Sequence, residues 1–417
     1  MTACGLDFGT SNSAIGVALE AGPVLVPLEQ ERTLMPSAVF FDFERRGEVL
    51  FGSPGIAAYV AQVDGRLMRA LKSILGSPLI DEETQLGKRR LPLRDVVALF
   101  VRHLKERAEA FAGRSLDRVV HGRPVRFVDG DDAADRRAQA VLEEIARTVG
   151  FREVSFVYEP IAAAHHYEQT IDREELVLVA DIGGGTSDFS VVRLGPDRRA
   201  RPERSGDVLS TAGLRVGGTD FDAQLSLARV MPLLGMASRL LDKNLPMPAA
   251  LYHELAAWPT INFAYSARNE RLVADLMRQS REPAKVGRLL HVLRGRHGHA
   301  IALGVEQAKM ALSERAAAAI DLACVETGLS VSVGRAGLDR AIARQVERVH
   351  RAACACLADA GVTGQAIDAV FLTGGSSRVP AVRAAIARAA PQVRLVTRSD
   401  LLSVGLGLTQ IAAGTAE

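Results

Sequence analysis

Short runs of apolar residues, and segments in which apolar and polar residues alternate, predict β-strands in the first part of the chain. Residues 4–8 and 14–19 are two such segments around a Gly-Thr-Ser-Asn turn, and Ser37–Phe43 is a third. Other segments place apolar residues three or four positions apart, which predicts helices with one buried face. Leu91–Phe111 and Asp135–Val149 show this helical spacing.

The same patterns return in the second part. Val179–Leu194 predicts strand, tight turn and strand, whereas Ala366–Ile386 predicts strand, Gly-Gly turn and helix. Residues 231–302 are mainly helical in pattern, and Ala323–Val333 alternates like a strand. Further elements are expected in Leu116–Val125, Glu153–Tyr167, Gly304–Glu314, Arg335–Ala360 and Ser403–Ala413. Strands that alternate with helices twice over predict an α/β chain with two similar halves.

Composition narrows the class of protein. A chain of 417 residues is too long for one ordinary core, so two or more domains are expected. The net charge of +2 gives no field that favours nucleic acid or a membrane surface. No apolar run reaches the roughly 18–20 residues of a membrane span, and no signal peptide is recognised, so we expect a cytoplasmic protein. The four cysteines show no metal-binding spacing.

Two Gly-rich turns carry the clearest chemistry. Each follows a strand that ends in an aspartate, Asp7 in "GLDFGTSNS" and Asp181 in "ADIGGGTSD". Glycine lets backbone N–H groups approach a phosphate closely, and two carboxylates facing it could hold a hydrated Mg²⁺. Neither turn is a Walker A loop, because neither has Gly-Lys-Ser/Thr leading into a helix. One such hairpin alone could be an ordinary tight turn, but two copies favour a phosphate site.

Two weaker features accompany these turns. "LTGGSSR" (Leu372–Arg378) places Gly-Gly between a strand and a helix N-terminus, where free N–H groups could face a nucleotide. On the helix containing "VEQAKMALS", the residues Glu306, Lys309, Met310 and Ser313 share one face. This face could bind a ribose and a purine, or it could be a solvated face with a Glu–Lys pair.

Together, the motifs resemble the ATPase domain of the 70-kilodalton heat-shock (DnaK-like) family. "GLDFGTSNSAIGV", "YEPIAAA", "ADIGGGTSDFSVV", "EQAKMALS" and "LTGGSSRVPAV" occur in that family's order and spacing. The apolar "MPLLGM" and the long insert after it are most similar to the short YegD-like branch. The resemblance implies an actin-like ATPase fold of the actin, hexokinase and heat-shock superfamily. In that fold, two lobes, each with a ribonuclease-H-like mixed sheet flanked by helices, hold a nucleotide in the cleft between them.

The resemblance also implies a division of the chain. Lobe I is expected over 1–172, with 36–92 as its smaller subdomain and a C-terminal helix in 395–417 that returns to it. Lobe II is expected over 173–394, with 223–333 as a helical insert that could bind a protein partner. The family's peptide-binding half is expected to be absent, because the chain ends near the end of the ATPase domain.

The resemblance assigns roles to the residues that match the family's motifs. Lys72 would reach the γ-phosphate and the attacking water, Glu159 would order the water shell, and Asp188 would orient water. Asp7 and Asp181 would bind Mg²⁺ through its waters, and Thr186 would contact the γ-phosphate. The other residues expected to bind ATP or ADP are Gly9, Thr10, Ser11, Asn12, Gly183, Gly184, Gly185, Gly217, Gly218, Glu306, Lys309, Met310, Ser313, Gly374, Gly375, Ser376, Arg378 and Asp400. K⁺ is a further possible ion by resemblance.

One position departs from the family. Met310 stands where the family usually has an arginine that stacks on adenine, so we expect weaker nucleotide affinity. The main hypothesis is a slow, chaperone-like ATPase that closes around Mg-ATP and opens after hydrolysis. The alternatives are a nucleotide-sensing switch with little turnover and a polymerising bacterial actin.

Overall fold

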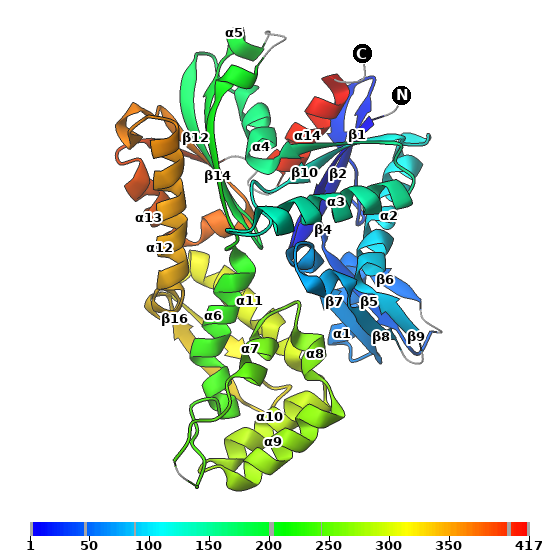
Figure 1. Ribbon diagram of the computed structural model, residues 1–417, viewed down its shortest axis with the longest axis vertical. Helices are drawn as coiled ribbons and strands as arrows, with labels where there is room; N and C mark the ends of the chain where they lie inside the picture. The colour runs from blue at the N-terminus through cyan, green and yellow to red at the C-terminus, as the bar shows by residue number, and fades with distance from the viewer. Residues whose placement is uncertain are drawn as a thin grey trace. The chain divides into compact units, whose positions relative to one another are not determined.

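The computed structural model describes residues 3–45, 48–86, 89–199, 204–242, 244–397 and 402–414. The chain divides into two compact units, which are described separately (Figure 1). Unit 1 combines Met1–Gly218 with Glu347–Glu417, and unit 2 is Thr219–Val346. This division keeps both expected lobe cores in unit 1, so the lobe boundary at residues 172 and 173 stays a prediction.

Unit 1 contains two sheets of five main strands. The first sheet has the order β11-β10-β1-β2-β3, with β4 paired to β2. Within it, β1, β10 and β11 are parallel, whereas β2 is antiparallel to β1 and to β3. Its strands are β1 (Ala3–Phe8), β2 (Asn12–Leu19), β3 (Gly22–Leu25), β4 (Met35–Pro36), β10 (Arg118–Arg123) and β11 (Glu153–Tyr158).

The second sheet repeats this plan in the order β14-β13-β12-β17-β18. Here β12, β17 and β18 are parallel, and β13 is antiparallel to both β12 and β14. Its strands are β12 (Glu175–Ile182), β13 (Ser187–Leu194), β14 (Val208–Leu214), β17 (Ala369–Thr373) and β18 (Arg394–Thr397). The predicted α/β fold with two similar mixed sheets is therefore confirmed.

Two helices pack between these sheets, as Figure 1 shows: α4 (Glu159–Glu168) and α14 (Ser403–Gly414). They share a buried cluster with both sheets, which includes Ala162, Val179 and Leu408. A Cβ at Gly407 would lie 1.8 Å from the Ala162 carbonyl oxygen, so the two helices meet backbone to backbone. The three alanines of "YEPIAAA" are all buried, and small side chains there suit such a close approach.

The outer faces of the two sheets are covered by longer helices. Helices α2 (Leu93–Ala112) and α3 (Asp132–Thr148) pack on the first sheet with a large buried cluster. Helix α12 (Arg335–Asp359) reaches the second sheet, where Ser210 of β14 donates to the Cys356 carbonyl at 2.6 Å. Helix α13 (Pro380–Ala389) contacts α12 through His350 and the Ala385 carbonyl, 2.8 Å apart.

Smaller elements complete unit 1. A three-stranded sheet and a hairpin precede α2, and the 3-10 helix η1 lies between them. The elements are β5 (Ala38–Asp42), β6 (Val49–Phe51), α1 (Gly52–Val60), β7 (Gly65–Arg69), η1 (Leu71–Ile74), η2 (Pro78–Asp81), β8 (Glu83–Leu86), β9 (Arg89–Pro92), α5 (Pro196–Arg199), η3 (Ser205–Asp207), η5 (Gly364–Ala366) and η6 (Gly375–Arg378).

Unit 2 is mainly helical, with one hairpin. Its helices are α6 (Gly218–Arg229, beginning at the last residue of unit 1), η4 (Met231–Leu234), α7 (Ala250–Ala256), α8 (Ile261–Ala264), α9 (Ala267–Gln279), α10 (Pro283–Arg294), α11 (Gly298–Glu314) and the first part of α12, up to Val346. The hairpin joins β15 (Ala317–Asp321) to β16 (Ser330–Gly334). In the described part of the chain, no helix is both long and apolar enough to cross a membrane.

One predicted strand is largely wrong. The alternation over Ala323–Val333 predicts a strand, but only its end belongs to β16. The earlier residues form a turn in which Leu322 donates to the Leu329 carbonyl at 3.0 Å. Gly328 takes a left-handed conformation with φ of 77°, which a strand cannot contain. The sequence pattern also missed β15.

Candidate functional site

The first Gly-rich turn connects β1 to β2 and is braced by two buried serines. Ser37 donates to the Gly9 carbonyl at 2.7 Å, and its hydroxyl lies 2.8 Å from that of Ser13. The Gly9 N–H donates to Ser13 at 3.2 Å. A Cβ at Gly9 would lie 2.0 Å from the Asn12 carbonyl oxygen, so the tight turn requires glycine. These contacts fix the turn, and the backbone of Thr10 and Ser11 lies at its tip.

The second Gly-rich turn connects β12 to β13 and closes with a bond from the Gly183 N–H to the Thr186 carbonyl, 2.9 Å. The Gly183 carbonyl accepts from Gly218 N–H at 3.0 Å and from Ser376 Oγ at 2.8 Å. The structure thus brings the predicted residues Gly218 and Ser376 onto this turn.

Glycines pack against the second turn where a side chain would collide. A Cβ at Gly217 would lie 2.5 Å from the Gly185 nitrogen, and one at Gly374 would lie 2.4 Å from the Ile182 carbonyl oxygen. Gly374 also has a φ of 78°, which favours glycine. The "LTGGSSR" segment therefore supports the second turn, and Gly375 within this segment is exposed.

The two turns meet in unit 1. A Cβ at Gly184 would lie 2.2 Å from Ser11 Oγ, and one at Gly185 would lie 2.6 Å from Thr10 Oγ1. The hollow beside them, lined among others by Thr10, Lys72 and Thr186, has a volume of about 10 Å³. That is room for about one water molecule. The sequence places these turns far apart, and the fold brings them into contact.

Lys72 and Glu159 form a buried ion pair beside the turns. The ammonium donates to Glu159 Oε1, and both side chains are less than 10% exposed. Lys72 lies on η1, which follows the left-handed Ala70, with φ of 58°. Glu159 is the first residue of α4, where the helix dipole favours a negative charge. Two segments 87 residues apart therefore place one charge pair at the site.

Three buried aspartates surround this pair, and burial is the largest cause of their raised pKa values. Burial and the charge of Glu159 raise the pKa of Asp7 to about 7 and that of Asp188 to about 8. The same two causes raise the pKa of Asp181. Burial alone would lower the pKa of Lys72, but Glu159 and Asp7 outweigh it and raise the pKa. The lysine therefore remains protonated at neutral pH.

The charges at this site do not balance. Asp7, Glu159, Asp181 and Asp188 influence one another, and Lys72 is the cation that acts on the three aspartates. Asp188 Oδ2 is buried without a hydrogen-bond partner among the described residues. A divalent cation with its waters fits such a surplus of carboxylate. Among the described residues, no group of three or more His, Cys, Asp or Glu side chains could hold a metal ion.

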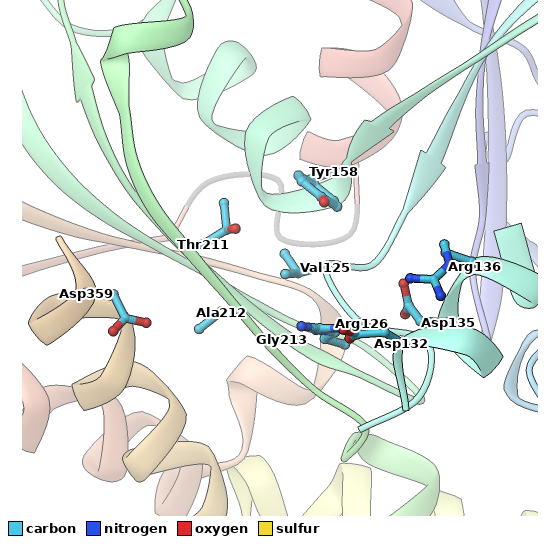
Figure 2. Close-up of a pocket in the computed structure, with 10 residues that line it drawn as sticks. All are labelled: Val125, Arg126, Asp132, Asp135, Arg136, Tyr158, Thr211, Ala212, Gly213 and Asp359. Atoms are coloured by element: carbon cyan, nitrogen blue, oxygen red, sulfur yellow. The ribbon is translucent and has the colours of Figure 1, made fainter. Parts of the chain in front are cut away.

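A larger pocket of about 500 Å³ lies elsewhere in unit 1 (Figure 2). Val125 and Arg126 face it from the end of the first sheet, Tyr158 from β11 and Gly213 from β14. Its lining combines cationic and acidic side chains with the edge of β14. The sequence motifs give no sign of this pocket.

The predicted ribose and adenine residues of unit 2 lie on α11. Lys309 is buried and pairs with Asp222 of α6 at 2.8 Å, whereas Met310 is 63% exposed. Ser313 Oγ donates to the Lys309 carbonyl at 3.4 Å, and Glu306 is partly buried one turn before Lys309. Burial raises the pKa of Asp222 to about 6, although Lys309 opposes this.

The other predicted adenosine residues, Gly374, Gly375 and Arg378, belong to unit 1. Contact between them and α11 therefore stays a prediction. Asp400 lies outside the described residues. The motifs did not single out Asp222, although it stands in "GGTDFDAQL", directly after the Gly-rich turn. The available signal in the sequence was an acidic residue in the first turns of the helix that follows the glycines.

The chain was compared with models of known protein families, and the match supports the expected family. The family model described as Hsp70 protein matches residues 82–227 and 298–394, which is more than half of the chain. The matched segments contain Glu159, the second Gly-rich turn, the α11 face and the segment after β17. The first Gly-rich turn and Lys72 lie outside them.

Proposed function

The chain belongs to the Hsp70 family of ATP-binding proteins, and on that premise we propose that it hydrolyses Mg-ATP slowly at the two Gly-rich turns. The observation that carries this proposal is the buried Lys72–Glu159 pair, surrounded by three aspartates, where the two turns meet. Phosphoryl transfer to water needs positioning and charge neutralisation rather than a covalent intermediate. The site offers both.

Each group has a proposed task. The backbone N–H groups of Gly9, Thr10 and Ser11 bind the phosphates from the first sheet, and those of Gly183–Gly185 bind them from the second. Thr186 contacts the γ-phosphate. Lys72 is a mobile point charge that follows the negative charge as it develops on the transferred group.

The carboxylates have two different tasks in this proposal. Asp7 and Asp181 hold the waters of Mg²⁺, which supplies charge neutralisation for the phosphates. Glu159 keeps Lys72 in place through the ion pair, and it helps to order the waters. Asp188 orients the attacking water, since one of its oxygens has no hydrogen-bond partner in the described part of the chain. Burial and the charge of Glu159 raise the pKa values of the aspartates, and a bound cation would lower them.

The proposal is tested with Lys72→Met, which keeps the length of the side chain and removes its charge. Phosphate release in a single turnover should fall by about 100-fold or more, because an electrostatic group aimed at the transferred phosphate is lost. ATP binding, measured by calorimetry, should persist. The matched control is Lys285→Met, which removes an exposed lysine paired with Glu282 in unit 2, and its rate should equal that of the unchanged protein.

The outcomes separate the enzyme from the binding module. Loss of turnover with retained binding supports hydrolysis at Lys72. Turnover that survives Lys72→Met would contradict the assignment of this lysine. An unchanged protein that binds Mg-ATP but releases no phosphate above background would contradict the enzyme and favour a nucleotide-sensing switch.

A specific observation favours the switch as the second candidate. The two turns touch, and the hollow beside them has a volume of only about 10 Å³, so a triphosphate needs the turns to separate. Binding would then change the arrangement of the two sheets whether or not hydrolysis follows. Cross-linking across the turns, with Ser11→Cys and Gly184→Cys, should form a disulfide that ATP prevents.

Chaperone-like action is the biological role that we attach to this ATPase, with the helical insert of unit 2 (residues 223–333) as the surface for a protein partner. K⁺ beside Mg²⁺ is a further proposal. A pull-down with the protein locked by Lys72→Met and ATP, compared with the same protein carrying ADP, tests for a nucleotide-dependent partner. Sedimentation with ATP tests the alternative of a polymerising actin, for which we expect no filaments because of the insert.

A further inference from the structure

The segment Arg123–Phe127, which we call the wall segment, separates two hollows of unit 1. Pro124 and Phe127 line the 10 Å³ hollow beside Lys72, whereas Val125 and Arg126 line the 500 Å³ pocket. Figure 2 shows Val125 and Arg126 between β14 and the start of α3. The side chains of Val125 and Phe127 are buried, and polar contacts hold the backbone of the segment between the two hollows.

Arg123 supplies most of these contacts. It is 9% exposed and donates to the Pro124 carbonyl at 3.0 Å and to the Val125 carbonyl at 3.4 Å. It also pairs with Asp135 of α3 at 2.8 Å and donates to Gln139. The guanidinium lies 5.1 Å from the ring centre of Phe127. One side chain therefore binds the wall segment at several points.

Asp135 completes the clamp from the helix side. Its Oδ1 accepts from the Phe127 N–H at 2.6 Å, while its Oδ2 accepts from Arg123. Asp135 thus binds both the first and the last residue of the wall segment. A buried ion pair gains little stability over apolar residues of the same size, so a role in fixing geometry accounts for it better than a role in stability.

The wall segment carries one contact to the proposed site. The Val125 N–H donates to Asp188 Oδ1 at 2.6 Å, and Asp188 Oδ2 has no hydrogen-bond partner among the described residues. The residue before Val125 is a proline, which has no N–H that could replace this donor. The orientation of the Asp188 carboxylate therefore depends on where the wall segment places the Val125 amide at Oδ1, besides the neighbouring Thr186 side chain.

We propose that Arg123 and Asp135 are positioning residues for Asp188, acting through the Val125 amide that they hold in place. This inference rests on the proposed function, because it assigns Asp188 to the reaction. The ion pair touches neither nucleotide nor water in this role. Its removal should lower the rate of hydrolysis and leave nucleotide affinity unchanged.

The kinetic test uses Arg123→Met, with Asp135→Asn as a second variant that keeps an acceptor for the Phe127 N–H. The single-turnover rate should fall about ten-fold through misplacement of Asp188, while the Kd for ATP stays within about two-fold. The control is Arg126→Met, which breaks an exposed pair with Asp132 on the same segment. This control should keep the rate of the unchanged protein.

A double-mutant cycle tests whether the pair acts through Asp188. In an Asp188→Asn background, Arg123→Met should change the rate by less than about two-fold, because the group that it positions is already lost. A general structural defect would lower the rate by the same factor in both backgrounds. Equal factors would therefore overturn the proposal.

Hydrogen exchange of the Val125 amide gives a readout that does not need turnover. In protein labelled with ¹⁵N-valine, this amide should exchange at least ten-fold faster after Arg123→Met and remain unchanged after Arg126→Met. If the Val125 amide exchanges at the same rate in Arg123→Met as in the protein without substitution, the inference is overturned, even if ATP is hydrolysed. If the unchanged protein hydrolyses no ATP, the proposed function fails, and Val125 exchange alone decides whether the pair positions this contact.

Discussion

The two sheets of unit 1 have the same strand order and pairing, yet they differ at the ends of two equivalent strands. These strands are β10, which lies beside β1, and β17, which lies beside β12. In the first sheet, β10 ends at Arg123, Pro124 follows it, and charged side chains hold the next part of the chain. In the second sheet, β17 ends at Thr373, and the left-handed Gly374 packs its backbone onto Ile182. Equivalent places in the two sheets thus support the site by different means.

The Gly-rich turns repeat this contrast. The hydroxyl groups of Ser13 and Ser37 brace the first turn. The second turn is braced by one hydroxyl group, that of Ser376, and by the backbone of Gly217 and Gly218. One topology therefore produces two half-sites that share an aspartate at the end of a strand but little else. The repeated fold therefore fixes where the two Gly-rich turns lie, while local residues decide which contacts brace each turn.

The largest predicted effect is the dependence of stability on pH, and it differs between Asp7 of the first sheet and Asp188 of the second. Folded-state pKa values of about 7 for Asp7 and about 8 for Asp188 lie above the ordinary value of about 3.9. Through these two groups the folded protein holds more protons than the unfolded chain, so their contribution to the free energy of unfolding falls as pH rises from about 4 toward 8. Burial lowers the pKa of His121 to about 4, which opposes this trend below about pH 6.5. Each group contributes at most about 1.4 kcal/mol per pH unit.

Substitutions sharpen this prediction. Urea unfolding followed by circular dichroism, without nucleotide or Mg²⁺, should show a flatter pH dependence for Asp7→Asn below pH 7. Asp188→Asn should flatten it up to about pH 8, so that its effect is the larger of the two between pH 7 and 8. A pH dependence that both Asp7→Asn and Asp188→Asn leave unchanged would contradict the account of the buried carboxylates.

The next effect tests the glycine support of the second sheet. Gly374→Ala should reduce the free energy of unfolding by about 3 kcal/mol, because it adds a left-handed strain and a backbone collision. Gly361→Ala is the matched control: its φ is also positive, at 68°, but nothing lies within 4 Å of its Cβ. It should cost about 1 kcal/mol. Equal costs for the two variants would show that close approach at Gly374 is unimportant.

The smallest effect concerns nucleotide affinity and unit 2. Met310→Arg restores the cation that the family usually has, and it should tighten ATP binding about two- to five-fold. Gln307→Arg adds the same charge at another exposed position of α11 and should leave the Kd unchanged. Calorimetry on both variants checks this. An equal gain for both would indicate general electrostatic attraction rather than contact with the base.

Much of this structure follows from local sequence. The two Gly-rich turns, their aspartates and the two similar halves were predictable, because glycine spacing and strand alternation are local signals. Lys72 and Glu159 were expected from the family resemblance, and the structure pairs them. The roles of these residues in catalysis stay predictions.

The remaining features depend on contacts between distant residues. The Lys309–Asp222 pair joins two helices 87 positions apart, and nothing near either residue announces its partner. The Arg123–Asp135 pair closes across a loop whose path the sequence does not specify. The error over Ala323–Val333 has a local cause, since the turn at Gly328 was outweighed by an alternating pattern.

The central claim is that both turns bind one nucleotide together. The most direct measurement is amide hydrogen exchange in the segments 9–12 and 183–186, with and without saturating Mg-ATP, in the Lys72→Met protein that holds ATP unhydrolysed. The account predicts that both segments become protected at the same ATP concentration. Protection of one turn alone, or of neither when calorimetry shows bound ATP, would contradict it.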